Sequence, residues 1–282
     1  MRYRDALKNA KEQCIKVGVG EQAPLFLLLE LTEREAHNLY MEYEEEMEGE
    51  LLIEYNQKVN RLLQGEPLDH ILGYSYFYGY RFVVDERVLI PRPETEELVA
   101  NILNVYDEHF PSQPITLIDV GSGSGAIAIS LKLEEKNIQV SASDISKDAI
   151  AVASTNAKTL GAEVSFLVGN MLEPFIENNY QVDILVSNPP YIPKNEKMEQ
   201  SVIGYEPHVA LFGGEDGLHF YREIFKKAHL VIKERSILAF EIGYDQKEIL
   251  KQEAKKYFKD DRIEVYKDMN GKNRMLFIYH NC

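Results

Sequence analysis

The segment Ser187-Asn188-Pro189-Pro190-Tyr191 carries the side chains best suited to chemistry in this sequence. Its two prolines lack an N–H and stiffen the chain, so the segment leaves a preceding strand with carbonyl groups able to face a guest. Asn188 offers an amide with an acceptor and a donor, and Tyr191 offers a flat ring for stacking. These groups predict a cradle for a planar NH2 group, as found on an amide or an adenine. The alternative is a turn after a strand, because Asn-Pro-Pro breaks regular structure.

The chemistry that such a cradle supports is alkylation of the nitrogen. An amide nitrogen is a poor nucleophile because its lone pair is delocalised. Hydrogen bonds from the NH2 group to the Asn188 side chain and the Pro189 carbonyl would favour a less planar nitrogen as charge develops on it. A methyl donor aligned with that nitrogen turns a bimolecular encounter into a unimolecular step. This scheme requires no strong general base.

A glycine-rich loop, Gly121-Ser122-Gly123-Ser124-Gly125, follows the apolar run 115–120. Glycines let the backbone turn sharply and let a ligand approach the main chain closely. The G-x-G-x-G spacing suits S-adenosylmethionine (SAM), whereas Gly121-x-Gly123-x-x-Ala126 also fits the dinucleotide fingerprint. A tight strand-to-helix turn without a ligand is the remaining interpretation.

Asp144 lies 19 positions after Gly125, at the end of the next apolar run. A carboxylate there can accept hydrogen bonds from both ribose hydroxyls of a nucleoside cofactor. It could instead cap the following helix, together with Ser146. The spacing favours the ribose role and does not separate SAM from NAD.

Elements that would position these residues alternate between strand and helix from about residue 94. The predicted strands are 115–120, 139–143, 164–168, 182–187, 237–242, 262–266 and 275–279, and predicted helices include 147–160 and 218–233. Several runs are apolar enough for burial on both faces, as in a parallel sheet covered by helices. We therefore expect an open α/β sheet with its ligands at the carboxyl ends of the strands.

The first third of the chain reads differently. Apolar residues recur at helical spacing between Leu51 and Leu63, so residues 1 to about 70 are expected to be helical. Two β-rich runs on either side of Asp85-Glu86 predict a hairpin that ends at Pro91. The predicted boundaries are a helical domain over 1–72, a β-hairpin linker over 73–93 and an α/β domain over 94–282.

Composition excludes several functional classes. The 282 residues include 31 Lys and Arg against 46 Asp and Glu, a formal charge of −15, which opposes general binding to a phosphate backbone. Cys14 and Cys282 form no CxxC pair or Cys/His cluster, so neither a metal site nor a disulfide framework is expected. The apolar stretch 25–29 is far shorter than the ~20 residues that span a bilayer. We expect a cytoplasmic protein with no membrane segment.

The combination of motifs resembles the release factor glutamine methyltransferases, the PrmC or HemK family, over nearly the whole chain. The matching segments are Gly65-Glu66-Pro67 with Ile71-Leu72-Gly73, Val88 to Glu96, Asp119 to Gly125, Asn188 to Tyr191, Glu206 to Leu218, Glu241 to Gln246, and Lys267 to Arg274. The Asn-Pro-Pro-Tyr tetrad alone is shared with adenine methyltransferases, and the combination is far more specific.

The resemblance implies an N-terminal helical domain that docks a substrate protein and a C-terminal seven-stranded, Rossmann-like methyltransferase domain. The implied substrate is the glutamine of the Gly-Gly-Gln motif in class I peptide chain release factors, with SAM as cofactor. The implied catalytic residues are Asn188, Pro189 and Tyr191. The implied SAM-binding residues are Asp119, Gly121, Ser122, Gly123, Ser124, Gly125, Asp144, Met171 and Asn188. Met171 can cover an adenine face through its polarizable sulfur.

Three other functions share parts of this pattern. An adenine amino-group methyltransferase acting on nucleic acid would use the same tetrad, but the charge of −15 and the lack of a basic domain oppose it. An NAD-dependent dehydrogenase would have no evident use for Asn-Pro-Pro-Tyr. A protein that binds SAM without turnover would not need an intact tetrad. We expect a monomer that acts on release factors and has no direct nucleic-acid partner.

Overall fold

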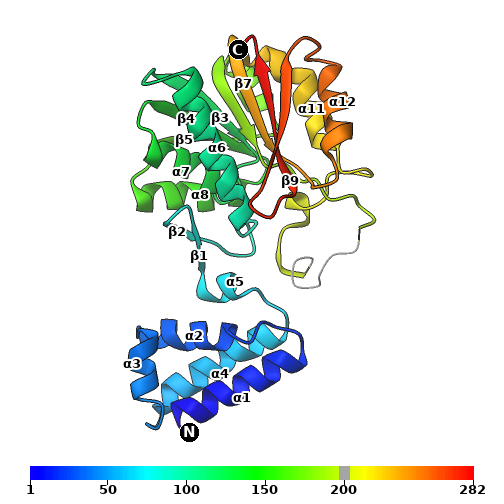
Figure 1. Ribbon diagram of the computed structural model, residues 1–282. Helices are drawn as coiled ribbons and strands as arrows, with labels where there is room; N and C mark the ends of the chain where they lie inside the picture. The colour runs from blue at the N-terminus through cyan, green and yellow to red at the C-terminus, as the bar shows by residue number, and fades with distance from the viewer. Residues whose placement is uncertain (197–203) are drawn as a thin grey trace. The chain divides into compact units, whose positions relative to one another are not determined.

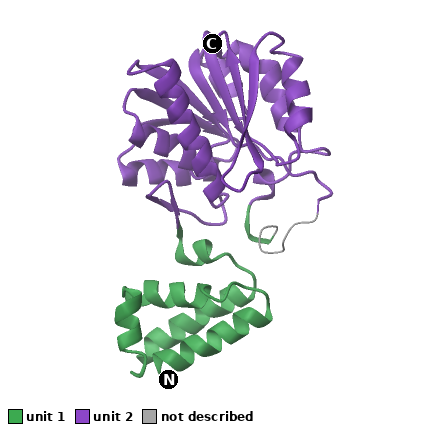
Figure 2. Cartoon of the chain, in the orientation of Figure 1, with its two compact units in different colours: residues 1–74, 198–206 green, residues 75–197, 207–282 purple. Residues whose placement is uncertain are grey.

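The computed structural model describes residues 1–196 and 204–282, which form two compact units (Figures 1 and 2). The N-terminal unit comprises Met1–Tyr74 together with the described residues 204–206. The C-terminal unit comprises the described part of Ser75–Lys197 and all of Pro207–Cys282.

The N-terminal unit is helical, as the apolar spacing predicted. Its helices are α1 (Tyr3–Lys16), α2 (Ala23–Thr32), α3 (Ala36–Met41), α4 (Gly49–Leu63) and α5 (Leu68–Leu72). Leu27 and Leu28 of α2, Leu39 of α3 and Tyr55 of α4 are fully buried in one shared core. The Tyr55 hydroxyl also donates a hydrogen bond to the Pro24 carbonyl at 3.1 Å, which satisfies a buried polar group.

The hairpin is present, but its predicted turn at Asp85-Glu86 is wrong. Strands β1 (Tyr74–Phe77) and β2 (Tyr80–Val83) are joined by Tyr78 and Gly79. Both joining residues have positive φ, 52° and 80°, as two-residue hairpin turns require. The apolar residues that suggested a second strand, Val84, Val88 and Ile90, are buried against helix α8 (Lys147–Leu160).

Seven strands of the described residues form the large sheet of the C-terminal unit. They are β3 (Ile115–Val120), β4 (Ile138–Asp144), β5 (Val164–Val168), β6 (Val182–Ser187), β7 (Ile232–Glu241), β8 (Arg262–Lys267) and β9 (Asn273–His280). The spatial order is β5-β4-β3-β6-β7-β9-β8, parallel except for β9, which runs antiparallel to β7 and β8. The predicted α/β sheet is confirmed.

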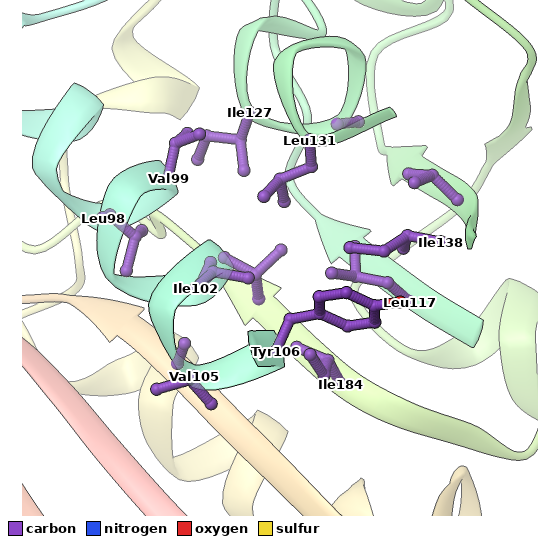
Figure 3. Packing of buried hydrophobic residues seen from close by; sticks show 14 of the residues in the cluster. Leu98, Val99, Ile102, Val105, Tyr106, Leu117, Ile127, Leu131, Ile138 and Ile184 are labelled. Carbon is purple, nitrogen blue, oxygen red and sulfur yellow. The ribbon is translucent and has the colours of Figure 1, made fainter. Parts of the chain in front are cut away.

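Helices cover both faces of this sheet (Figure 1). One face packs against α6 (Pro93–His109), α7 (Ala126–Glu134) and α8 (Lys147–Leu160). In Figure 3, Ile102 and Tyr106 of α6 lie against Leu117 and Ile184 of the strands. The opposite face packs against α9 (Glu173–Glu177), α11 (His219–Lys227) and α12 (Lys247–Lys255).

The helix predicted over 218–233 ends earlier than expected. Helix α11 stops at Lys227 and a single 3-10 turn, η2 (Ala228–Leu230), follows it. Ile232 already belongs to β7, where it pairs with Val182 of β6. The helical spacing of apolar residues extends to residue 233, but pairing with β6 places Ile232 and Lys233 in a strand. Tertiary contacts of this kind override a local pattern.

The order of the strands reverses at β3, which has β4 on one side and β6 on the other. In an open α/β sheet, ligands bind outside the carboxyl ends of the strands at such a switch point. The glycine loop follows β3, Asp144 is the last residue of β4, and Asn188 follows β6. The topology therefore brings the three predicted signals to one edge.

Across residues 1–196 and 204–282, no helix combines the length and apolarity that crossing a membrane requires. The same residues contain no group of three His, Cys, Asp or Glu side chains placed to hold a metal ion.

Candidate active site

A cavity within the C-terminal unit lies at this edge of the sheet. It is lined by most of the residues predicted from the sequence: Gly121, Ser122, Gly123, Ser124, Asp144, Met171 and Asn188. Pro190 also lines it, whereas Pro189 is buried behind the surface. Gly125 and Tyr191 adjoin lining residues in the sequence, and Asp119 lies two positions before Gly121, but none of the three lines the cavity.

The glycine loop is held open beside the cavity. Gly121, Gly123 and Gly125 all have positive φ, at 81°, 53° and 82°. A Cβ added at Gly125 would lie 3.1 Å from Ala153 Cβ, so this glycine allows the start of α7 to approach α8 closely. A Cβ added at Gly121 or Gly123 would meet nothing within 4 Å. The loop therefore leaves space for a ligand next to its backbone at the first two glycines.

Asp144 is bound to the backbone on both sides of its carboxylate. One oxygen accepts a hydrogen bond from the Gly123 N–H at 2.9 Å, and the other accepts from the Ser146 N–H at 2.9 Å. Burial raises the pKa of Asp144, which these hydrogen bonds partly oppose. Because each carboxylate oxygen has two lone pairs, Asp144 can still accept hydrogen bonds from a diol in the cavity.

Asp119 is a buried carboxylate beneath the loop. It is 0% exposed, and neither of its oxygens has a hydrogen-bond partner among the described residues. Burial raises the pKa of Asp119 to about 7. The Ala128 backbone N–H points toward the carboxylate and limits this increase, although it lies outside hydrogen-bonding geometry. The Ser122 hydroxyl is likewise buried and unpartnered among those residues. Such groups indicate a missing polar partner.

These observations fit SAM. The unpartnered Asp119 and Ser122 groups lie at the loop that would receive the charged amino-acid end, and the open side of Gly121 and Gly123 leaves room for it. The Asp144 carboxylate lines the cavity and has the acceptor oxygens that ribose hydroxyls require. Met171 is held at the cavity through its carbonyl, which accepts from the Ser143 hydroxyl at 3.1 Å.

Asn188 is anchored by its amino group. Its Nδ2 donates a hydrogen bond to Thr95 Oγ1 at 3.2 Å, and the side chain is half-buried in the cavity wall. This bond uses the donor end of the amide and leaves Oδ1 as an acceptor. The tetrad can therefore offer an acceptor to an NH2 group.

The backbone of the tetrad is tightly supported. Gln246 Nε2 donates to the Tyr191 carbonyl at 3.1 Å and to the Gly217 carbonyl at 3.3 Å. A Cβ added at Gly217 would lie 2.3 Å from the Tyr191 oxygen, and one at Gly213 would lie 2.5 Å from the Pro190 oxygen. The loop 213–217 thus fits closely against the tetrad and limits its movement.

Tyr191 is anchored in the core rather than in the cavity wall. Its ring packs against the hydrophobic cluster on the α11 and α12 face of the sheet. Burial raises the pKa of its hydroxyl to about 12, so Tyr191 is neutral at physiological pH.

Apolar side chains continue the cavity beyond Asn188. They come from the hairpin region and from the segment around α11: Phe77, Leu89, Pro91, Val209 and Phe220. An apolar wall of this kind suits the aliphatic stem of a side chain whose polar end meets Asn188.

Thr95 and Glu241 lie in the motif segments Val88 to Glu96 and Glu241 to Gln246, and no local sequence signal assigns either of them a role. In the structure the Thr95 hydroxyl donates to Glu241 Oε2 at 2.6 Å. The one available signal was Glu241, a charged residue at the end of the apolar strand β7, which pairs with β6, the strand before Asn188. Of two other junction residues, Arg92 lines the cavity, while Glu96 accepts from the Tyr78 N–H at 2.8 Å and ties α6 to the hairpin.

Comparisons with known proteins agree with this geometry. Residues 5–73 match the family model described as PrmC N-terminal domain, and residues 102–204 match the one described as Methyltransferase small domain. A release factor glutamine methyltransferase of Bacillus anthracis is 41% identical, with 98% of this chain and 99% of that protein covered. Another from Bacillus subtilis is 42% identical, with 96% of each chain covered.

Among solved structures, a methyltransferase from Pyrococcus furiosus superposes with a TM-score of 0.53 at 14% identity, covering 80% of this chain and 98% of that one. At this identity the likeness concerns the fold, and it supports the methyltransferase architecture of the large sheet.

Proposed function

The chain belongs to the release factor glutamine methyltransferases, and from this premise we propose that it transfers the methyl group of SAM to the side-chain amide nitrogen of a release factor glutamine. The glutamine is that of the Gly-Gly-Gln motif in class I peptide chain release factors, and its methylation supports translation termination. The observation that carries this proposal is the orientation of Asn188 at the cavity wall, where its Nδ2 is bound to Thr95 and, among the described residues, its Oδ1 has no partner; the glycine loop lines the same cavity.

When bound, SAM supplies an electrophilic methyl group on its sulfonium centre. Asp119, the loop 121–125, Asp144 and Met171 are the residues we assign to holding it. The Asp144 carboxylate is already held by the backbone N–H groups of Gly123 and Ser146 before any ligand arrives, so this part of the site needs little reorganisation on binding.

We assign the glutamine amide to the tetrad. Asn188 Oδ1 and the Pro189 carbonyl would accept hydrogen bonds from the two N–H groups of the amide. Tyr191, packed in the core on the α11 and α12 face, would hold the tetrad in place. Two acceptors at fixed positions orient the nitrogen and favour loss of its planarity as charge develops. The apolar cavity residues Phe77, Leu89, Pro91, Val209 and Phe220 would hold the methylene groups of the glutamine side chain and exclude water.

We further propose that the helical domain 1–72 docks the release factor, that residues 73–93 link it to the methyltransferase domain 94–282, and that the protein is a cytoplasmic monomer. Its substrate is a protein and not a nucleic acid. The excess of 46 acidic over 31 basic residues supports this, because it repels phosphate.

The test is mass spectrometry of an unmethylated release factor after incubation with the protein and SAM. Peptide mapping then places any added methyl group.

A further inference from the structure

Three polar side chains from distant parts of the sequence form a continuous chain of hydrogen bonds that begins at Asn188 of the tetrad and includes Thr95, which also lines the cavity. Asn188 Nδ2 donates to Thr95 Oγ1 at 3.2 Å, and the Thr95 hydroxyl donates to Glu241 Oε2 at 2.6 Å. Thr95 is 5% exposed and Glu241 is 2% exposed. Water therefore competes little for these bonds, and their direction is set by the protein.

The direction follows from the chemistry of each group. An ionised carboxylate only accepts hydrogen bonds, so Thr95 must spend its single hydroxyl proton on Glu241. The Thr95 oxygen can then only accept, and Asn188 must present its NH2 group to it. The opposite end of the amide, Oδ1, is thereby directed away from Thr95. A carboxamide rotated by 180° would place an acceptor against an acceptor.

We propose that Thr95 and Glu241 are positioning residues that fix the orientation of the Asn188 carboxamide, so that Oδ1 and not Nδ2 meets the substrate amide. This role rests on the proposed function, because only an NH2 substrate requires an acceptor there. A rotated Asn188 would offer a donor to a donor and would hold the glutamine nitrogen wrongly or not at all.

Glu241 must be ionised for this direction to hold, and its surroundings make ionisation sensitive to pH. Burial raises the pKa of Glu241 to about 7. Thr95, Arg274 of β9 and the Asn188 side chain oppose the increase, whereas Glu94 of α6 adds to it. From α11, the Tyr221 hydroxyl donates to the Glu241 backbone carbonyl at 2.6 Å. Tyr191 is a further titratable neighbour, and it stays neutral because burial raises the pKa of its hydroxyl to about 12. A protonated Glu241 could donate to Thr95, whose hydroxyl would then be free to donate to a rotated Asn188.

The first test compares Thr95→Val, which keeps the shape but removes the hydroxyl, with Thr95→Ser, which restores it. With release factor and SAM saturating, we expect Thr95→Val to lower kcat by about tenfold or more and Thr95→Ser to recover most of it. Thr155→Val is the matched control, since that hydroxyl is exposed and bonds only within its helix, to Ala151. SAM affinity should stay within about twofold in all variants. Equal kcat in wild type and Thr95→Val would overturn the proposal.

The second test does not depend on turnover. In protein labelled with 15N at asparagine, the side-chain NH2 signals of Asn188 are identified by their loss in Asn188→Asp. One of its two protons should be protected from exchange in the wild type, and that protection should disappear in Thr95→Val. Two fast-exchanging protons in the wild type would contradict the proposed orientation.

The pH profile gives the third readout. The kcat of the wild type should fall as pH decreases through about 7, and Glu241→Gln should lack that inflection because the titrating group is gone. Identical profiles would contradict the role of Glu241. An inactive wild type that still binds SAM would contradict the proposed function instead, and the exchange measurement would still decide the orientation of Asn188.

Discussion

The carboxylate of Asp144 accepts a hydrogen bond from the backbone N–H of Gly123 at 2.9 Å. This bond joins the end of β4 to the loop that follows β3, so the predicted ribose acceptor and the glycine loop form one rigid unit. The Asp144 carbonyl also accepts from the Gly169 N–H at 2.9 Å, which brings the segment after β5 to the same place. Three successive strand ends are thus linked around one residue.

Asp144→Ala should weaken SAM binding by about tenfold or more, because it removes the ribose acceptor and releases the loop. The kcat at saturating SAM should remain near that of the wild type, since Asp144 does not contact the tetrad. Isothermal titration and steady-state kinetics measure the two effects. Asp148→Ala, an exposed aspartate on the first turn of α8, is the control. Unchanged SAM affinity in Asp144→Ala would remove Asp144 from the binding site.

Asn188→Ala should lower kcat for glutamine methylation by about a hundredfold or more, because it removes an acceptor that orients the reacting nitrogen. SAM affinity should change by no more than about threefold. Asn170→Ala is the control for kcat, because Asn170 also lines the cavity but lies outside the tetrad. Methyl transfer at the wild-type rate in Asn188→Ala would contradict the assignment of the tetrad.

Asp119→Asn should stabilise the ligand-free protein above neutral pH while weakening its affinity for SAM. The pKa of Asp119 is raised from 3.8 to about 7 in the folded state, so folding binds a proton between these values. Stability contributed by Asp119 is therefore lost as pH rises from about 4 to about 7. Removing the buried charge should increase the free energy of unfolding at pH 8 by about 1 kcal/mol or more.

Thermal unfolding of wild type and Asp119→Asn at pH 5 and pH 8 checks this expectation. The difference in Tm should be larger at pH 8, where the wild-type carboxylate is ionised. A difference that is equal at the two pH values would show that Asp119 does not titrate between them.

Local signals sufficed for the parts of the fold that short segments determine. The strand 115–120, the glycine loop after it and the helix 147–160 were predicted with the bounds that the structure has. Their apolar runs, glycines and flanking polar residues all favour the same local structure, and the sheet edge then collects Asp144 and Asn188 through topology alone.

Signals that depend on distant partners were not available in the sequence. Val84, Val88 and Ile90 resemble strand residues, and only the presence of α8 explains their burial as a loop. Thr95 and Glu241 are 146 positions apart, so no local pattern links them or shows that both act on Asn188. The Tyr78-Gly79 turn could not be recognised in the sequence, because the aromatic residues on both sides of it favour a strand throughout.

Methylation of a release factor glutamine is the most direct measure of the central claim. An unmethylated class I release factor would be incubated with the wild-type protein and SAM, with Asn188→Ala in parallel, and its tryptic peptides analysed by mass spectrometry. We predict one added methyl group on the glutamine of the Gly-Gly-Gln peptide with the wild type only. An unmodified peptide, with SAM binding verified and transfer instead to adenine in a nucleic acid, would contradict the proposed substrate.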